Sequence, residues 1–522
     1  MNKNNNEIIL VMDFGSQYTQ LIARRIREHN VFCRVIRYDT KAEEILKIDP
    51  CGIVMTGGPS STYEGKVMPD KKIFSLGVPV LGICYGMQAM ADALGGKVKK
   101  ASQREYGNTK IKVRTNNLLF KGLPNSFISW MSHGDHVAKM PLHFNNYANT
   151  KHTKIASMAD YKRRLFAVQF HPEVIHTQNG KKIFRNFIYN ICGCSGTWTM
   201  RSFIKKSTDE IKKTVGYKNG RSSAGNVILG LSGGVDSSVC AVLLNKAIGK
   251  SLTCIFVDNG LCRKDEGRRV YEIFKKHFRI NLRYVDAGAG FLKRLKGVVS
   301  PELKRKIIGK EFIRVFDGEA KKIGGIKFLA QGTLYPDVIE SRSAFGGPSA
   351  TIKTHHNVGG LPKKMKLKLI EPLKDLFKDE VRQLGLELGM SEELIFRQPF
   401  PGPGLAVRIL GEVTKERLDI LKEVDWHVID AIKKAGLYRN LWQAFAVLLP
   451  IKSVGVMGDK RTYENVVAIR AVTSEDAMTA DWARLPYDLL AALSNKIINE
   501  VEGVNRVVYD ISSKPPSTIE WE

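Results

Sequence analysis

Apolar runs and amphipathic segments alternate along the first third of the chain. The apolar runs predict strands at Ile8–Phe14, Val31–Tyr38, Gly52–Gly58 and Leu165–Phe170, and the mixed segment Gln17–Glu28 predicts a helix. Strands separated by helices pair in parallel, because each helix carries the chain back across one face of the sheet. The pattern therefore predicts a parallel α/β domain in this part of the chain.

The same alternation starts again at Asn226–Leu231, which precedes an apolar segment, Val239–Ile248, with the character of a helix. A basic helix is expected near Met200–Val215, between polar segments rich in glycine and serine that are typical of a linker. The stretch Pro399–Gly404 reads PFPGPG and interrupts regular structure. We expect an α/β protein with two parallel-sheet domains, at 7–195 and 200–398, and a smaller C-terminal α+β domain at 399–522.

The net charge is strongly positive. Among 522 residues, 81 lysines and arginines stand against 52 acidic residues, a balance of +29. The excess is +14 over residues 1–195 and +17 over 196–400, whereas 401–522 carry −2. Such a charge suggests nucleic acid as a partner, but no aromatic-rich RNA-recognition motif accompanies it, and anionic small substrates explain it equally well. We expect no nucleic-acid partner, and an RNA-binding or tRNA-modifying protein remains the alternative from another class.

The cysteines and the start of the chain bear on the compartment. Eight cysteines are scattered along the chain, which is typical of reduced thiols, and the CGC at Cys192–Cys194 has no second pair at zinc spacing. The start MNKNNNE is polar, and no apolar run reaches the length of a membrane-spanning helix. We therefore expect a cytoplasmic protein without a membrane partner.

A cysteine between two glycines is the first candidate for chemistry. In the stretch PVLGICYG the spacing Gly82-x-Cys84-x-Gly86 follows a predicted buried strand. This is the pattern of a strand-to-helix elbow that presents a nucleophile above an α/β sheet, where the glycines permit a turn too tight for side chains. Small buried cysteines are also common in strands, so the pentapeptide alone leaves both interpretations open.

A nucleophilic cysteine needs a base. His171 in FHPE falls at the end of a predicted strand, and Glu173 is placed to orient its ring, as in a hydrolytic triad with a thiol. His133 in SHGD is the rival base, and it is the less favoured of the two because its position relative to a strand is less clear. The backbone N–H groups of Gly58 and Tyr85 would stabilise an oxyanion.

The stretches GGPSS, GICYG and FHPE, in this order over roughly residues 8–190, resemble class I glutamine amidotransferase domains. The resemblance implies that Cys84 attacks the side-chain amide of glutamine, that His171 transfers the proton and that Glu173 orients His171. The products would be ammonia and a glutamyl thioester, which water then hydrolyses.

A second candidate site follows the predicted strand at Asn226–Leu231. Glycines and serines at a strand–helix turn let backbone N–H groups approach a phosphate, and Asp236 could hold Mg²⁺ against a pyrophosphate. The Gly-Lys-Ser/Thr ending of a Walker loop is missing. The loop resembles that of N-type ATP pyrophosphatases, which implies ATP as co-substrate and Mg²⁺ as cofactor. The ATP-binding residues would be Ser232, Gly233, Gly234, Val235, Asp236, Ser237 and Ser238.

Five further stretches resemble the family of glutamine-hydrolysing GMP synthetases, so that the likeness covers essentially the whole chain. They are Lys304–Phe312, Ala330–Ser341, Ile352–Pro362, Pro399–Gly411 and Ser513–Glu522. The resemblance implies XMP as the acceptor and a homodimer formed through the third segment. It also implies XMP-contacting residues at Arg305, Asp459, Lys514 and Glu520, and a lid over ATP with Lys353, His355 and His356.

The residues themselves do not select the acceptor, because several amidating ligases adenylate an oxygen and displace AMP with ammonia. Another glutamine-dependent ligase, such as one that makes NAD, is the alternative within the enzymes, and the tail TIEWE favours XMP through the resemblance.

Overall fold

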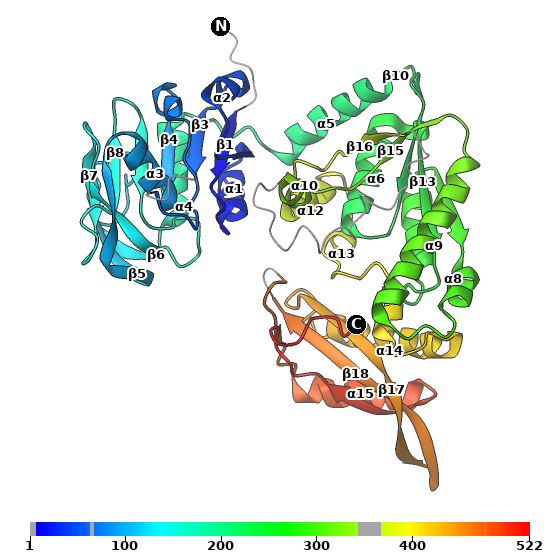
Figure 1. Cartoon of the computed structure of the whole chain (residues 1–522). Coiled ribbons are helices and arrows are strands. Elements are labelled where there is room, and N and C mark those ends of the chain that lie inside the picture. The colour runs from blue at the N-terminus through cyan, green and yellow to red at the C-terminus, as the bar shows by residue number, and fades with distance from the viewer. Residues whose placement is uncertain (1–6, 63–66, 343–366, 475–476) are drawn as a thin grey trace. The chain divides into compact units, whose positions relative to one another are not determined.

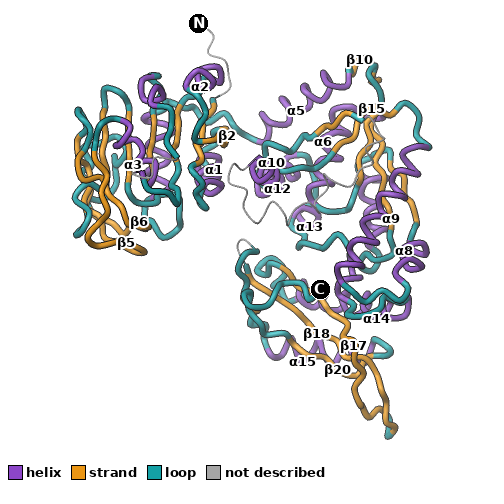
Figure 2. Tube along the Cα trace, viewed as in Figure 1, coloured by secondary structure: helices purple, strands orange, loops and turns teal. Residues whose placement is uncertain are grey.

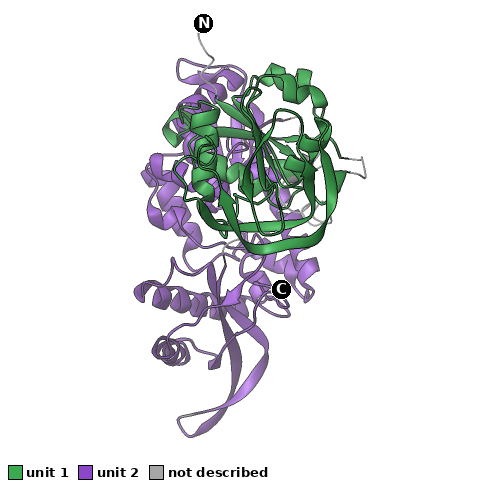
Figure 3. Ribbon diagram, turned by 90° about the vertical axis from the view of Figure 1, so that its left-hand side faces the viewer, with its two compact units in different colours: residues 1–203, 338–349 green, residues 204–337, 350–522 purple. Residues whose placement is uncertain are grey.

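The computed structural model describes residues 7–62, 67–342, 367–474 and 477–522, with side chains omitted for 340–342 and 457 (Figure 1). The chain divides into two compact units (Figure 3). Unit 1 takes in residues 1–203 and 338–349, and unit 2 takes in 204–337 and 350–522. The cut falls within helix α5 (Met200–Val215), in the region predicted to be a linker. The three predicted domain ranges stay predictions.

Unit 1 is built on a nine-stranded sheet in the order β2-β1-β3-β4-β9-β8-β7-β5-β6. The first five of these strands run parallel, and the residues of all but the edge strand β2 are almost all buried, as expected for strands covered on both faces. They are β1 (Ile8–Asp13), β2 (Phe32–Arg37), β3 (Gly52–Met55), β4 (Val80–Ile83) and β9 (Leu165–Val168).

Antiparallel strands extend this sheet, and the hydrophobic pattern did not predict them. The extension consists of β5 (Lys97–Val113), β6 (Ser126–Lys139), β7 (Asn145–Asn149) and β8 (Ser157–Asp160). Strands β5 and β6 alternate buried and exposed positions, which suits a sheet with one solvated face. The helices of unit 1 are α1 (Thr19–Arg27), α2 (Ala42–Ile48), α3 (Tyr85–Ala93) and α4 (Gly180–Arg185) (Figure 2).

Unit 2 contains a five-stranded parallel sheet in the order β14-β13-β12-β15-β16. Its strands are β12 (Asn226–Gly230), β13 (Leu252–Asp258), β14 (Leu282–Asp286), β15 (Ile326–Ala330) and β16 (Lys368–Ile370). Helices that matter below are α6 (Val235–Ile248), α7 (Glu266–Tyr271), α9 (Pro301–Lys321) and α12 (Lys378–Glu387).

The C-terminal part of unit 2 forms a second, largely antiparallel sheet. Strands β17 (Gln443–Met457), β18 (Lys460–Thr473) and β19 (Asp481–Trp482) pair in order, and β20 (Val504–Tyr509) joins β18 in parallel. Helices α14 (Lys415–Lys434) and α15 (Tyr487–Glu500) accompany it. One buried apolar cluster includes residues of both sheets of unit 2, so this part shares a core with the parallel sheet.

The predicted fold class is confirmed: two parallel-sheet regions and a smaller C-terminal α+β region are present. Among the described residues, no helix combines the length and the apolar character needed to cross a membrane.

Candidate active sites

The first site lies at the carboxyl ends of three neighbouring parallel strands of unit 1. Strand β3 leads into Gly57 and Gly58, β4 leads directly into Cys84, and β9 is followed three residues later by His171. In open parallel sheets this edge is where side chains from separate strands converge. Residues far apart in the sequence are thereby brought into one site.

Close backbone contacts explain the glycines around Cys84. A Cβ on Gly86 would lie 2.5 Å from the Met55 carbonyl oxygen, and one on Gly82 would lie 2.7 Å from the Gly86 carbonyl oxygen. Cys84 itself has φ 52° and ψ −107°, a strained conformation for a residue with a side chain. The elbow therefore holds Cys84 in one orientation at the start of α3.

His171 and Glu173 form a buried pair beside the cysteine. His171 Nδ1 lies 2.7 Å from Glu173 Oε1, and the two side chains are 4% and 0% exposed. A Cβ built on Gly57 would lie 3.2 Å from His171 Cε1 and 3.8 Å from Cys84 Cβ, so both side chains border this glycine. The structure brings the three predicted catalytic residues together.

The surroundings of His171 favour its charged form. Burial lowers the pKa of His171, but the Glu173 carboxylate and the Cys84 sulfur outweigh burial and raise the pKa to about 11. An imidazolium held in this way is placed to stabilise a thiolate and to donate a proton to a leaving group.

One glutamine side chain contacts the cysteine and a second contacts that glutamine, and sequence reasoning missed both. Gln169 Nε2 lies 3.7 Å from Cys84 Sγ, and Gln88 Nε2 lies 3.4 Å from Gln169 Oε1. Gln169 stands two residues before His171, so it leaves the same strand end. That position is the one signal in the sequence that could have identified it.

The two residues predicted to stabilise an oxyanion lie next to each other. A Cβ on Gly58 would lie 3.4 Å from Tyr85 Cδ1 and 2.8 Å from the Phe14 carbonyl oxygen, so Gly58 is packed against the elbow. The Tyr85 hydroxyl donates to the Val67 carbonyl at 2.7 Å. Both residues are thus fixed beside Cys84.

The rival base, His133, is held by other groups. Its Nδ1 lies 3.0 Å from the Asp135 carbonyl oxygen and its Nε2 lies 3.5 Å from Glu105 Oε2. Burial lowers its pKa despite the Glu105 carboxylate. Its neighbour Ser132 contacts the cysteine through a carbonyl oxygen, 3.7 Å from Cys84 Sγ. His171 is therefore the better-placed base.

The second site is the loop between β12 and α6 in unit 2. The Ser232 and Ser237 hydroxyls lie 2.9 Å apart, and the Ser237 hydroxyl also donates to the Gly234 carbonyl at 3.1 Å. Gly233 has φ +75°, in the region that glycine adopts without strain. The loop is thus a tight turn at the start of a helix, a geometry that suits a phosphate. Val235 and Ser238 are buried in the first turn of α6.

Asp236 is the candidate metal ligand of this loop. Its Oδ2 lies 3.6 Å from Lys378 Nζ, and its Oδ1 is buried and has no hydrogen-bond partner among the described residues. Burial raises the pKa of Asp236 more than Lys378 lowers it. No group of three or more His, Cys, Asp or Glu side chains in the described parts of the chain could hold a metal. A carboxylate with one free oxygen fits Mg²⁺ if phosphate oxygens complete the coordination of the ion.

Two of the residues predicted to contact XMP, Lys514 and Glu520, belong to the C-terminal tail, and a third, Arg305 of α9, contacts the tail. Glu520 accepts from Arg408 Nη2 at 2.9 Å and from Gln443 Nε2 at 2.7 Å. Arg305 donates to the Glu522 carbonyl oxygen, and Lys514 Nζ donates to the Ala477 carbonyl at 2.7 Å.

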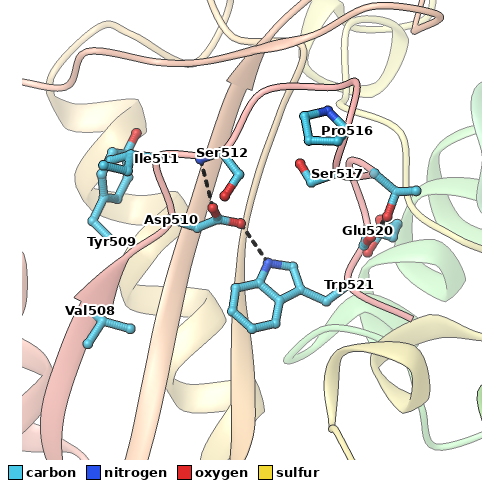
Figure 4. A pocket seen from close by; sticks show the side chains of 10 residues that line it. Val508, Tyr509, Asp510, Ile511, Ser512, Pro516, Ser517, Glu520 and Trp521 are labelled. Carbon is cyan, nitrogen blue, oxygen red and sulfur yellow. Dashed lines mark hydrogen bonds between the residues drawn. The ribbon is translucent and has the colours of Figure 1, made fainter.

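Glu520 also lines a cavity of about 670 Å³, which the tail forms with the end of β20 (Figure 4). Within this cavity the Trp521 indole N–H donates to Asp510 Oδ2 at 2.9 Å. The tail therefore offers a hollow with carboxylate and indole groups at its wall.

The fourth of these residues is separated from the others. Asp459 lies in the turn between β17 and β18, with φ 63°. Glu520 contacts Gln443, at the opposite end of the 15-residue strand β17, which spans roughly 45 Å. One chain does not bring Asp459 and Glu520 together. The predicted lid residues Lys353, His355 and His356 lie outside the described residues.

Comparisons with known proteins match every part of this architecture. The model of Glutamine amidotransferase class-I matches residues 10–191, that of NAD synthase matches 203–280, and that of the GMP synthase C terminal domain matches 430–521. The GMP synthase (glutamine-hydrolyzing) of Brachyspira hyodysenteriae is 58% identical over 521 residues, which cover 100% of both chains. That of Carboxydothermus hydrogenoformans is 60% identical over 515 residues, covering 98% of this chain and 99% of the relative. The chain therefore belongs to the family of glutamine-hydrolysing GMP synthases.

Proposed function

We propose that this enzyme makes GMP from XMP, using ATP to activate XMP and glutamine as the source of ammonia. One observation carries the proposal: a single chain holds a buried Cys84–His171–Glu173 site and a separate glycine–serine loop, in which Asp236 Oδ1 has no hydrogen-bond partner among the described residues. The first arrangement suits amide hydrolysis and the second suits a pyrophosphate.

At the first site Cys84 acts as the nucleophile. Its thiolate attacks the side-chain amide carbon of glutamine, and the N–H groups of Gly58 and Tyr85 stabilise the oxyanion. His171 donates a proton to the departing ammonia and then takes one from the water that hydrolyses the thioester, while Glu173 holds its ring. The products are glutamate and ammonia.

At the second site the oxygen on C2 of XMP attacks the α-phosphorus of ATP, and pyrophosphate leaves. The loop Ser232–Ser238 binds the phosphates through its backbone N–H groups and hydroxyls. Ammonia then attacks C2 and displaces AMP, which gives GMP. Asp236 would hold Mg²⁺, which supplies charge neutralisation for the departing pyrophosphate.

Residues of the tail, together with Arg305 of α9, would bind XMP. Arg305 and Lys514 are cations suited to the phosphate, and Glu520 offers a carboxylate to the base or ribose. Because Asp459 lies far from Glu520 within one chain, its contact with XMP would have to be made to a second copy. We therefore propose a homodimer. We also propose that it is cytoplasmic, because eight scattered cysteines are typical of reduced thiols.

The dimer has a sharp test. Asp459→Ala and Glu520→Ala chains would each be inactive, but mixed dimers would hold one complete nucleotide site. After unfolding and refolding of an equal mixture, about a quarter of the wild-type activity should return if copies pair at random. A mixture that stays as inactive as its components would contradict a shared site.

The acceptor is tested by supplying XMP or deamido-NAD with ATP and ammonium and measuring AMP release. The match of residues 203–280 to NAD synthase is the reason for the second substrate. We expect AMP release when XMP is the acceptor and none when deamido-NAD is the acceptor. Release with deamido-NAD and none with XMP would overturn the proposal.

A further inference from the structure

The buried guanidinium of Arg408 donates two hydrogen bonds to the Glu520 carboxylate. Arg408, in the 3-10 helix Gly404–Arg408, donates from Nε at 3.1 Å and from Nη2 at 2.9 Å to the two oxygens of Glu520. The Arg408 side chain is 0% exposed, whereas that of Glu520 is 20% exposed toward the cavity of the tail. Two parallel bonds of this kind fix the plane of a carboxylate as well as its position.

The contact continues away from the cavity through two more charges. Arg408 Nη1 lies 3.7 Å from Asp425 Oδ1, and Asp425 Oδ2 lies 3.0 Å from Arg263 Nε. Asp425 is 1% exposed, so it has no access to solvent that could replace these partners. Two cations and two anions alternate, which leaves no net charge buried.

An aromatic ring lies against both cations of this group. The Arg263 and Arg408 guanidinium carbons each lie 5.1 Å from the centroid of the Phe400 ring, and that of Arg408 lies 4.0 Å from the Phe445 ring. Such contacts stabilise a desolvated cation and restrict the plane in which it lies. Phe400 belongs to the stretch PFPGPG, which therefore packs against both guanidinium groups as well as interrupting regular structure.

Arg263 ties the group to the loop after β13. The same loop is joined to the 3-10 helix of Arg408 by a hydrogen bond of 2.8 Å from the Leu405 N–H to the Leu261 carbonyl oxygen. A Cβ on Gly404 would lie 2.3 Å from that carbonyl oxygen, so the two segments are packed backbone to backbone. The parallel sheet and the C-terminal tail are thus linked by both charge and packing.

We propose that Arg408 is a positioning residue for XMP binding, which fixes the Glu520 carboxylate at the cavity of the tail through the series of charges Arg263–Asp425–Arg408–Glu520, whose two central side chains are buried. The inference rests on the proposed function, because it takes Glu520 as a contact to XMP. Arg408 touches neither XMP nor the reacting atoms; it acts through the orientation of Glu520.

The test is a double-mutant cycle on the full chain with ammonium as nitrogen donor, which leaves unit 1 out of the measurement. Arg408→Lys keeps the charge but loses the paired donors, and Glu520→Gln keeps the shape but loses the charge. Each should raise the KM for XMP by about ten- to a hundredfold, the range for loss of a hydrogen bond to a charged group. The KM for ATP and kcat should change by less than about threefold, because the interaction is made with bound XMP in the ground state.

The double variant separates positioning from a general structural role. If Arg408 acts through Glu520, the KM of the double variant should exceed that of the worse single variant by no more than about threefold, because coupled residues are not additive. Multiplied effects of the two substitutions would overturn the proposal. A KM for XMP in Arg408→Lys equal to that of the wild type would overturn it as well.

Two further variants keep the outcome clear if Arg408→Lys folds poorly. Gln443→Leu removes the 2.7 Å bond to Glu520 Oε1 without leaving a charge unpaired, and it should raise the KM for XMP by about tenfold. Arg417→Lys is the control, since the side chain of this arginine of α14 donates to the carbonyls of Leu410, Glu412 and Leu449 and, among the described residues, not to Glu520. Its KM for XMP should match that of the wild type. An unchanged KM in Gln443→Leu, or an equal rise in Arg417→Lys, would contradict positioning of Glu520.

The proposed function and the positioning role of Arg408 are contradicted by different results. If wild-type enzyme makes no GMP from XMP, ATP and ammonium, the proposed function is wrong. If the wild type does so and the cycle is additive, the function stands and the positioning role of Arg408 is wrong.

Discussion

His171 Nδ1 lies 2.7 Å from Glu173 Oε1, with both side chains buried at the carboxyl end of β9. The carboxylate leaves the other ring nitrogen, Nε2, for the cysteine, and it stabilises positive charge on the ring. This contact fixes the orientation of the His171 ring and favours its charged form.

Replacing Glu173 should therefore impair only the use of glutamine. In Glu173→Gln, the glutamine-dependent kcat should fall by about 10²- to 10⁴-fold, the range for general acid–base catalysis. Synthesis with ammonium should remain, because it occurs in unit 2. Steady-state assays with each nitrogen donor check this, and a variant that uses glutamine as well as the wild type would contradict the role of Glu173.

The pair also predicts a pH dependence of stability. The pKa of His171 is raised to about 11 in the folded chain. A raised pKa stabilises the fold fully below the unfolded value, about 6.5 for histidine, and this contribution is lost as the pH rises toward the folded value.

The difference in melting temperature between the wild type and Glu173→Gln should accordingly shrink between about pH 6.5 and pH 9.5. Scanning calorimetry at both pH values measures it. A difference that grows with pH would show that His171 is not held as an imidazolium.

Removing the charge of Asp236 should stop activation of XMP. In Asp236→Asn, XMP-dependent pyrophosphate formation should fall by about 10²-fold or more, since a metal ion contributes several kcal/mol to such a step. Glutamine hydrolysis in unit 1 should persist. The control is Asp265→Asn, an exposed residue with φ 57° that asparagine adopts readily. Equal pyrophosphate formation by both variants would remove Asp236 from the site.

A buried lysine should make a large contribution to the stability of unit 2. Lys304 is 0% exposed and its Nζ lies 2.5 Å from Glu522 Oε2 and 2.7 Å from the Ile409 carbonyl oxygen. Lys304→Met leaves a carboxylate and a carbonyl without their donor and should lower the free energy of unfolding by about 3–5 kcal/mol.

Denaturant titration followed by fluorescence checks this expectation. Lys306→Met, on an exposed face of the same helix, should change the free energy of unfolding by less than about 0.5 kcal/mol. If the two variants unfold at the same denaturant concentration, the buried contacts of Lys304 contribute nothing.

The elbow around Cys84 gives a steric prediction. Gly86→Ala places a Cβ 2.5 Å from the Met55 carbonyl oxygen, whereas at Gly134 the nearest atom would be 3.8 Å away. Gly86→Ala should therefore lower the free energy of unfolding by about 1–3 kcal/mol, and with it the melting temperature. The same variant should hydrolyse glutamine more slowly, whereas Gly134→Ala should change neither stability nor glutamine hydrolysis. A stable, fully active Gly86→Ala enzyme would show that the elbow can move.

Local sequence predicted the parts of the fold that depend on neighbouring residues. Apolar runs gave β1, β3 and β9 to within a few residues, and the helix expected at Met200–Val215 coincides with α5. The spacing around Cys84 predicted the elbow because glycine is required there by contacts within the turn itself.

Long-range pairing left no such signal. In the series of charges that holds Glu520, the contacts Arg408–Glu520 and Arg263–Asp425 each join residues more than a hundred positions apart. A lone arginine or glutamate in a sequence is normally a solvated surface group, so nothing in the sequence marks these pairs. The antiparallel extension β5–β8 was missed because its strands are half polar. The separation of Asp459 from Glu520 depends on the length of β17 and its pairing with β18, which no motif reports.

The proposed reaction uses two separable sites, and Cys84→Ala tests their independence most directly. GMP formation is measured with glutamine and then with ammonium at mildly alkaline pH, where free ammonia is present, in wild type and variant. Loss of the nucleophile should reduce glutamine-dependent synthesis by about 10⁴- to 10⁶-fold. Ammonium should restore synthesis to the wild-type level, because adenylation of XMP requires nothing from the Cys84 sulfur. A variant that still uses glutamine, or a folded variant that ammonium does not rescue, would contradict the account.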